Sequence, residues 1–146
     1  MTARMTGRET AYWLVKSEPE AFSWDDQLRA GAEPWSGVRN FAARNHLRAM
    51  RAGDQAFFYH SNQGREIVGI VEVVREAYPD PTAESGDWSA VDMRAVAALA
   101  RPVTLAALKA DPRFADLALL RQSRLSVLPV SAAHWAMICA LGGGTG

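Results

Sequence analysis

The chain has 146 residues, of which 49% are hydrophobic and 22% are charged. This size and composition are typical of one soluble globular domain with a single sizeable core. The 16 basic and 16 acidic side chains balance, which excludes a global positive field for gripping a phosphate backbone, so any contact with nucleic acid must be local.

The composition also excludes several kinds of site. Cys139 is the single cysteine, so the chain has no internal disulfide and no cysteine-based metal centre. Its neighbours are apolar, and we expect a buried thiol in a reducing, cytoplasmic setting. The three histidines lack the spacing of metal ligands, and no apolar run is long enough to span a membrane. The sequence therefore predicts a soluble monomer without metal, cofactor or membrane partner.

The first predicted element is a strand over residues 12–18, which is rich in aromatic and β-branched residues. Pro19 ends it, because proline cannot donate to a ladder. Lys16, Ser17 and Glu18 emerge at this end, where they either line a site or simply face solvent.

A short helix follows the strand. Ser23 is its predicted N-cap, because a serine oxygen can accept from an early helical N–H. Trp24 and Leu28 are four residues apart and are expected to form its apolar face. Residues 31–34 are predicted to be a loop.

The central stretch runs from Trp35 to Asn45. Gly37 allows a backbone bend, and Asn40 is the predicted N-cap of a helix over residues 41–50. The amides of Asn40 and Asn45 offer both a donor and an acceptor, as the edge of a nucleobase does. Trp35 offers a flat face on which a base could stack; the alternative is a tryptophan of the core.

Two faces of this helix follow from its spacing. Three apolar side chains share one face: Ala43, Leu47 and Met50. Three arginines share the next face: Arg44, Arg48 and Arg51. Such a row can meet phosphates or form a solvated helix face.

A hairpin is predicted after the helix. Residues 55–61 form the second strand, and residues 67–74 form the third, with a polar glycine-containing loop at 62–65 between them. The second strand is apolar on both faces, which indicates a covered sheet. Gly69 is expected at a bulge or at a close approach of another segment.

The next predicted elements are less regular. Residues 80–87 form a polar excursion, and alternation predicts a strand over residues 91–99 that Pro102 breaks. Thr104 caps a short helix, and residues 116–122 form a further turn or helix.

The last predicted strand covers residues 126–130, and Pro129 places it at an edge or a bulge. Ser131 caps a closing helix. Three side chains of that helix are expected to be buried: Trp135, Ile138 and Leu141.

The signals for catalysis are poor. The chain has no glycine-rich phosphate loop and no nucleophile elbow. Glu18 and Asp80 are the one carboxylate pair that could be considered, and His60 is better explained as a hydrogen-bonded histidine of the interior. We therefore assign no catalytic residue.

Four longer motifs together resemble the EVE domain family. They are Tyr12-Trp13-Leu14-Val15-Lys16-Ser17-Glu18-Pro19, Trp35-x-Gly37-Val38-Arg39-Asn40-x-x-Ala43-Arg44-Asn45, Gly53-Asp54 through Tyr59-His60-Ser61-Asn62, and Arg124-Leu125-Ser126-Val127-x-Pro129-Val130. The run Gly69 to Val74, followed by Ala77 to Pro81, fits the same pattern. Ser36 stands where the family often carries an acidic residue, and Phe41-Ala42 where Tyr-Gln is common.

The resemblance implies an α+β, PUA-like fold, which is a bent β-barrel of about five to six strands with short helices around it. YTH and ASCH domains are relatives in this superfamily. The expected domain covers residues 11–142, between a disordered tail at 1–10 and a flexible tail at 143–146.

The resemblance further implies that the domain binds a modified base, such as methylated or hydroxymethylated cytosine in DNA or RNA, in an aromatic cage without catalysis. The implied base-binding residues are Lys16, Ser17, Glu18, Trp35, Ser36, Asn40, Asn45, Tyr59, Ser61 and Trp88. The arginines expected at the flanking phosphates are Arg39, Arg44 and Arg48. The alternative is a small hydrolase of a modified nucleoside, as some ASCH relatives resemble, which would use Lys16 and Glu18.

Overall fold

The computed structural model describes residues 10–62 and 64–143. Almost all of the two predicted tails, 1–10 and 143–146, lies outside these ranges, as does residue 63 of the predicted hairpin loop.

Six strands form one mixed sheet in the order β2-β5-β4-β3-β1-β6. Their bounds are β1 Tyr12–Ser17, β2 Ala32–Trp35, β3 Gln55–His60, β4 Glu66–Pro79, β5 Ser89–Thr104 and β6 Val127–Val130. The central strands β1 and β3 pair in parallel, with Lys16 opposite Tyr59, and the other neighbours are antiparallel. The prediction of an edge position for Pro129 is confirmed, because β6 pairs with β1 alone among the described strands.

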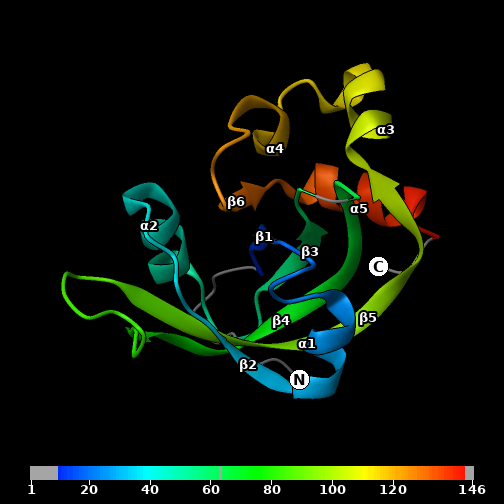
Figure 1. Ribbon diagram of the computed structural model, residues 1–146. Coiled ribbons are helices and arrows are strands. Elements are labelled where there is room, and N and C mark those ends of the chain that lie inside the picture. The colour runs from blue at the N-terminus through cyan, green and yellow to red at the C-terminus, as the bar shows by residue number, and fades with distance from the viewer. Residues whose placement is uncertain (1–9, 63, 144–146) are drawn as a thin grey trace.

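The sheet is strongly bent. The ladder between β4 and β5 shifts register at four places, and each such irregularity adds bending and twist. Figure 1 shows these two long strands curving around the shorter ones. The ladder ends at β2 and β6, so the described sheet is not closed into a barrel by hydrogen bonds. The α+β class, the number of strands and the bending are confirmed.

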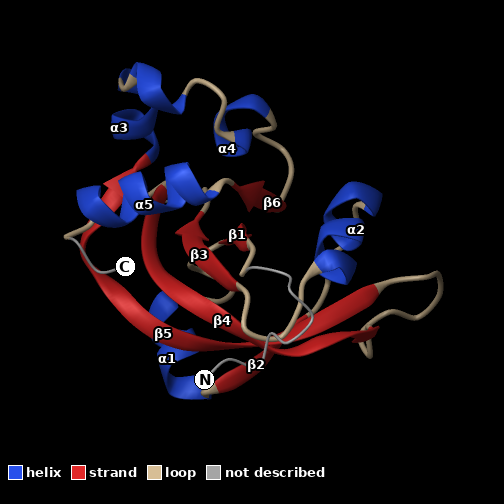
Figure 2. Ribbon diagram, turned by 180° about the vertical axis from the view of Figure 1, so that it is seen from behind, coloured by secondary structure: helices blue, strands red, loops and turns tan. Residues whose placement is uncertain are grey.

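Five short α-helices cover this sheet. Their bounds are α1 Trp24–Ala30, α2 Phe41–Ala49, α3 Leu105–Ala110, α4 Ala118–Arg121 and α5 Ala132–Leu141, with a 3-10 turn at Pro112–Phe114. The four predicted N-caps are confirmed by side-chain hydrogen bonds: Ser23, Asn40, Thr104 and Ser131. Helices α3, α4 and α5 gather at one end of the sheet, whereas α2 stands apart from them on the other side of β6 (Figures 1 and 2).

The buried residues confirm the predictions made from the spacing of apolar residues in α2 and β3. The apolar face of α2 is buried as predicted, and Phe57 and Phe58 of β3 are fully buried. A Cβ at Gly69 would lie 2.5 Å from the Trp24 ring. The predicted close approach at Gly69 is therefore the packing of this indole from α1.

Four local predictions are wrong. The predicted loop 31–34 belongs mostly to the edge strand β2, which pairs with β5. Strand β5 continues past Pro102, because the register jumps from Ala98 to Val103 and leaves the proline in a bulge, where no ladder donor is needed. Leu28, predicted for the apolar face of α1, and Leu141, predicted to be buried, are 52% and 37% exposed.

Candidate functional site

A cavity of about 420 Å³ lies beside the carboxyl end of β1, and this volume is within the usual range of small-ligand pockets. It brings together six of the predicted site residues: Lys16, Ser17, Glu18, Trp35, Ser36 and Arg39. Seven further lining residues were not predicted: Ala21, Phe22, Glu33, Pro34, Gly37, Val38 and Ser126.

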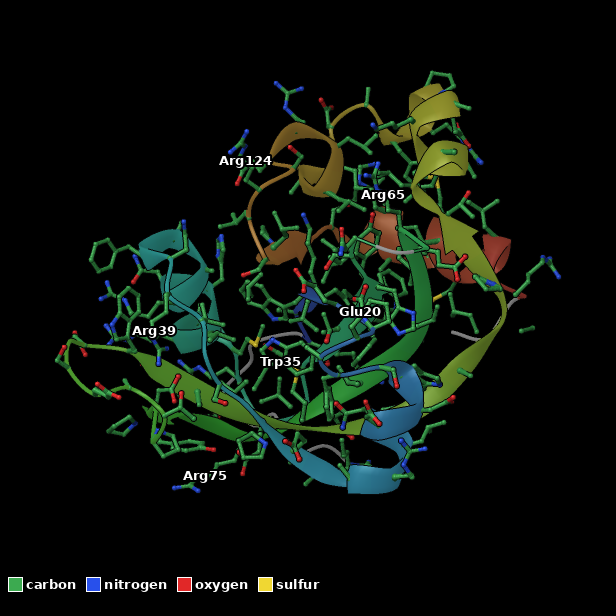
Figure 3. The ribbon with its side chains drawn as sticks, viewed as in Figure 1. Glu20, Trp35, Arg39, Arg65, Arg75 and Arg124 are labelled. Atoms are coloured by element: carbon green, nitrogen blue, oxygen red, sulfur yellow. The ribbon has the colours of Figure 1, made fainter. Side chains whose placement is uncertain are left out.

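Trp35, the last residue of β2, forms the aromatic wall of this cavity. Its indole is only 8% exposed, and it packs edge-to-face against Phe58 and Phe22, with ring centroids 5.6 Å and 6.3 Å apart. In Figure 3 Trp35 lies near the centre of the view, below Glu20 of the β1–α1 loop. Trp35 is thus a core residue that also lines the cavity. The two alternatives predicted for this tryptophan, a place in the core and a place in a pocket wall, do not exclude each other.

Phe22 is the second aromatic residue of the cavity. It is held by the β1–α1 loop, where the Phe22 N–H donates to the Glu18 carbonyl at 2.9 Å and the Ser17 hydroxyl donates to the Phe22 carbonyl. Sequence reasoning missed Phe22. Its position in a short turn between a strand end and a capped helix, after Pro19, is the signal that could have found it.

The opposite wall is the loop after β2, and Asp80 holds it in place. The Gly37 N–H and the Arg39 guanidinium donate to Asp80 Oδ2 at 2.8 Å and 3.0 Å, while Thr82 donates twice to Asp80 Oδ1. Gly37 has a φ of +82°, a conformation that glycine adopts without strain. The Asp80 side chain is fully buried, so this carboxylate is a structural clamp and not an acid–base partner of Glu18.

The ionisation of Asp80 follows from these contacts. Burial alone would raise the pKa of Asp80, but the hydrogen bonds from Thr82, Gly37 and Arg39 outweigh it and hold this pKa well below its usual range. The charge is therefore present under all physiological conditions, and it anchors the cavity wall to the loop between β4 and β5.

Several polar groups of the cavity keep free hydrogen-bonding capacity. The Glu18 carboxylate and the Ser36 and Ser126 hydroxyls make no side-chain hydrogen bond within residues 10–62 and 64–143. Lys16 donates to the Ser123 carbonyl at 2.7 Å, and burial lowers the pKa of Lys16. The cavity therefore presents acceptors and hydroxyl groups beside an aromatic wall.

Three residues predicted for the base-binding pocket, Asn40, Asn45 and Trp88, make their contacts away from this cavity. Asn40 accepts from the Ala43 N–H as a helix cap, and the Asn45 amide accepts from Arg44. Trp88 stacks instead on Phe41, with ring centroids 5.1 Å apart and planes 9° apart. The expected slot between two indoles therefore does not form: Phe22, not Trp88, is the second aromatic residue that lines the cavity with Trp35.

The arginines expected at phosphates already have acidic partners. Arg44 and Arg48 lie 3.9 Å and 2.5 Å from the carboxylate oxygens of Asp87, and Arg39 is bound to Asp80. The row on α2 thus holds the loop between β4 and β5 against the helix. Figure 3 shows Arg39 at the left of the view, below α2.

Tyr59 and Ser61 lie on the other side of Lys16. Both line a second cavity of about 360 Å³, which also contains Lys16. Tyr59 is buried, and burial raises the pKa of its hydroxyl although the nearby Arg65 opposes this shift. These two residues therefore do not complete the lining of the Trp35 cavity.

The described residues contain no group of three or more histidine, cysteine or acidic side chains that could hold a metal ion. Within the same ranges, no helix has the length and apolar character required to cross a membrane. Cys139 is a buried free thiol, as expected, and burial raises its pKa.

Comparison with known proteins gives a consistent match. The family model described as EVE domain matches residues 11–141. The NMR structure of a protein from Rhodopseudomonas palustris is 59% identical with a TM-score of 0.87, over 92% of this chain and 94% of that chain. The human THYN1 protein, solved in complex with DNA containing 5-methylcytosine, is 32% identical with a TM-score of 0.85, over 94% of this chain and 100% of that chain.

A more distant likeness concerns the fold alone. The YTH domain of Zygosaccharomyces rouxii MRB1, solved in complex with N6-methyladenosine RNA, has a TM-score of 0.59 at 20% identity, over 92% of this chain and 87% of that chain.

Proposed function

Because the chain belongs to the EVE domain family, we propose that it binds a modified nucleobase, such as methylated or hydroxymethylated cytosine in DNA or RNA, in the Trp35 cavity. The binding of 5-methylcytosine DNA by the related human protein supports the class of ligand. The observation in this chain that carries the proposal is a cavity with an aromatic wall and with hydrogen-bonding groups that have no side-chain partner among residues 10–62 and 64–143.

The chemistry of the wall fits an extruded base. Stacking of a base on an aromatic side chain contributes about 1–3 kcal/mol, and an extruded base also needs donors and acceptors held in place at its edge. Trp35 and Phe22 supply the aromatic surface, and their packing against Phe58 fixes them. The slot for the base is thus formed before the ligand arrives.

Glu18 is the proposed reader of the base edge. A carboxylate accepts well from the exocyclic amine of cytosine, and the Glu18 carboxylate lines the cavity without a partner among the described residues. Ser36 and Ser126 are the proposed contacts to the remaining edge. A methyl group that fits the apolar part of the wall adds about 1–3 kcal/mol of discrimination.

A panel of oligonucleotides tests this proposal. We expect 5-methylcytosine or 5-hydroxymethylcytosine oligonucleotides to bind roughly tenfold or more tightly than plain ones at one stated salt concentration. Glu18→Gln should abolish most of that preference. Glu20→Gln is the matched control, since Glu20 is exposed in the same loop and does not line the cavity. Equal binding of all oligonucleotides by the native protein would refute the proposal.

Binding without a chemical step, as a cytoplasmic monomer, is part of the same proposal. A hydrolase of a modified nucleoside is the second candidate, because Lys16, whose pKa burial lowers, shares the cavity with Glu18. Incubation with methylated or acetylated cytidine separates the two. We expect the nucleoside to be recovered unchanged, and turnover that Lys16→Met abolishes would replace the binding proposal.

A further inference from the structure

The second cavity, beside Tyr59, has a composition of its own. Its volume is about 360 Å³, and three leucines form its floor. Its polar lining consists of Lys16, Tyr59, Ser61, Arg65, Lys109 and Ser123. The cavity thus collects three cationic side chains from β1, the β3–β4 hairpin and α3, and its lining includes no carboxylate of a described residue.

Two of the cationic side chains in this cavity, one from the hairpin and one from α3, are not bound to an acidic side chain of the described residues. Arg65 and Lys109 are exposed, and neither makes an ion pair within the described ranges. In contrast, the three arginines predicted to contact phosphates, Arg39, Arg44 and Arg48, are all bound to Asp80 or Asp87. In a chain of zero net charge, unpaired cations around one cavity favour an anionic ligand.

The other polar groups are suited to an anion with acceptor oxygens. The Tyr59 hydroxyl is protonated at neutral pH, as in any ordinary tyrosine, and burial raises its pKa further, so it is a donor. The Ser61 side chain makes no hydrogen bond within the described part of the chain and is a second hydroxyl donor. Phosphate contacts in proteins come from this set of arginine, lysine, serine and tyrosine groups.

Lys16 connects this cavity to the Trp35 cavity. Its side chain lines both, and in the parallel ladder it lies opposite Tyr59, with its ammonium 5.9 Å from the Tyr59 ring centre. The Ser61 N–H also donates to the Ser17 carbonyl at 2.9 Å, so the two cavities are walled by adjacent strands. Figure 3 shows Arg65 near α3 and Trp35 below it, nearer the centre of the view.

We propose that the second cavity binds a backbone phosphate of the nucleic-acid strand whose base enters the Trp35 cavity. Arg65 and Lys109 supply the charge, Tyr59 and Ser61 donate to the phosphate oxygens, and the attached sugar lies on the leucine floor. This inference rests on the proposed function and adds the contact that binds the strand regardless of its base.

The test is the salt dependence of binding by the double variant Arg65→Gln, Lys109→Gln. Each lost phosphate contact lowers the magnitude of the slope of log affinity against log salt by about 0.7–0.9. Because Arg65 and Lys109 share one phosphate, we expect a decrease of about 0.7–0.9 and roughly tenfold weaker binding at about 0.1 M salt. Modified and plain oligonucleotides should be weakened equally, because a phosphate contact carries no base information. Fluorescence anisotropy with both oligonucleotides measures these quantities.

The matched control removes two exposed arginines elsewhere, Arg75→Gln with Arg101→Gln. Figure 3 shows Arg75 on the opposite side of the view from Arg65. An equal effect of the control, or an unchanged slope in the double variant, would overturn the inference.

A titration with inorganic phosphate, followed by NMR shifts of the Ser61 and Arg65 amides, separates a free-anion site from a strand contact. Amide shifts together with oligonucleotide binding that the double variant leaves unchanged would assign the cavity to a free anion and overturn the inference. If the native protein binds both oligonucleotides equally, with the expected slope change in the variant, the phosphate contact stands and the modified-base proposal fails.

Discussion

Asp80→Asn should both destabilise the fold and loosen the wall of the Trp35 cavity. The substitution keeps the shape of the side chain but removes its charge and one acceptor oxygen. If the amide oxygen faces Thr82, the amide NH2 faces two donors, the Gly37 N–H and the Arg39 guanidinium. The reverse orientation sets the same conflict against Thr82.

The contacts give the magnitude. A hydrogen bond to a charged group contributes about 1.5–3 kcal/mol, and two of them are lost in either orientation. The Arg39 side chain is 39% exposed, so water takes over part of its contact. We therefore expect a loss of about 2–4 kcal/mol, which for a chain of this size lowers the Tm by roughly 5–15 °C.

The pH dependence has a defined sign. The folded-state pKa of Asp80 lies below its unfolded value of about 3.9. The stabilisation is therefore complete above that value and is lost as the pH falls through it toward the folded pKa. Urea unfolding of the native protein and the variant should give free energies that differ most at neutral pH and converge in acid.

Binding provides the second readout. Because Gly37 and Arg39 line the cavity, Asp80→Asn should weaken the binding of modified oligonucleotides more than that of plain ones. Thr82→Ala is the control. It removes the Thr82 hydroxyl, which donates to Asp80 and accepts from Arg39, but it leaves the Gly37 and Arg39 hydrogen bonds to Asp80 in place. It should cost about 1.5–3 kcal/mol and keep the preference for modified oligonucleotides. The clamp assignment is refuted if Asp80→Asn melts within about 2 °C of the native protein and keeps its preference for modified bases.

Three further predictions concern single residues. Gly69→Ala should lower stability by about 1–3 kcal/mol through collision with Trp24; a Tm equal to that of the native protein would contradict this. Burial lowers the pKa of His60, which accepts from the Trp24 N–H, so its contribution should be present above about pH 6.5 and lost as the pH falls through the folded pKa. His60→Gln, which keeps an acceptor, should flatten the unfolding free energy between neutral and mildly acidic pH. Trp35→Ala should cost about 3–5 kcal/mol, because the indole is buried; Trp35→Phe should keep most of the stability yet weaken modified-base binding, as calorimetry and the oligonucleotide panel would measure.

Local signals predicted much of the fold. The four N-caps and the buried face of α2 depend on residues within one or two helical turns, so their patterns are visible in the sequence. Strand β2 was missed because its hydrogen bonds are made with β5, about 60 positions later. An edge strand that contains Pro34 carries little signal of its own.

The candidate site was predicted in part for the same reason. Lys16, Ser17 and Glu18 were found because they lie at the end of a recognisable strand, and they line the cavity. Asp80 and Trp88 belong to a loop whose contacts with residues 37–48 span about 40 positions. The spacing of residues within this loop does not indicate whether Asp80 or Trp88 contacts the cavity wall. The role of Asp80 in holding that wall was therefore missed, and the stacking of Trp88 on Phe41 was not predicted.

Strand β6 has a consequence for the order in which the protein matures. It pairs with β1 across more than a hundred residues, and the Lys16 ammonium is held by the Ser123 carbonyl 107 positions later. Such distant pairings form late, since chain closure is entropically costly. A polypeptide emerging from the ribosome would therefore lack the Ser126 part of the Trp35 cavity and the anchor of Lys16 at Ser123 until residues 123–130 had docked on β1.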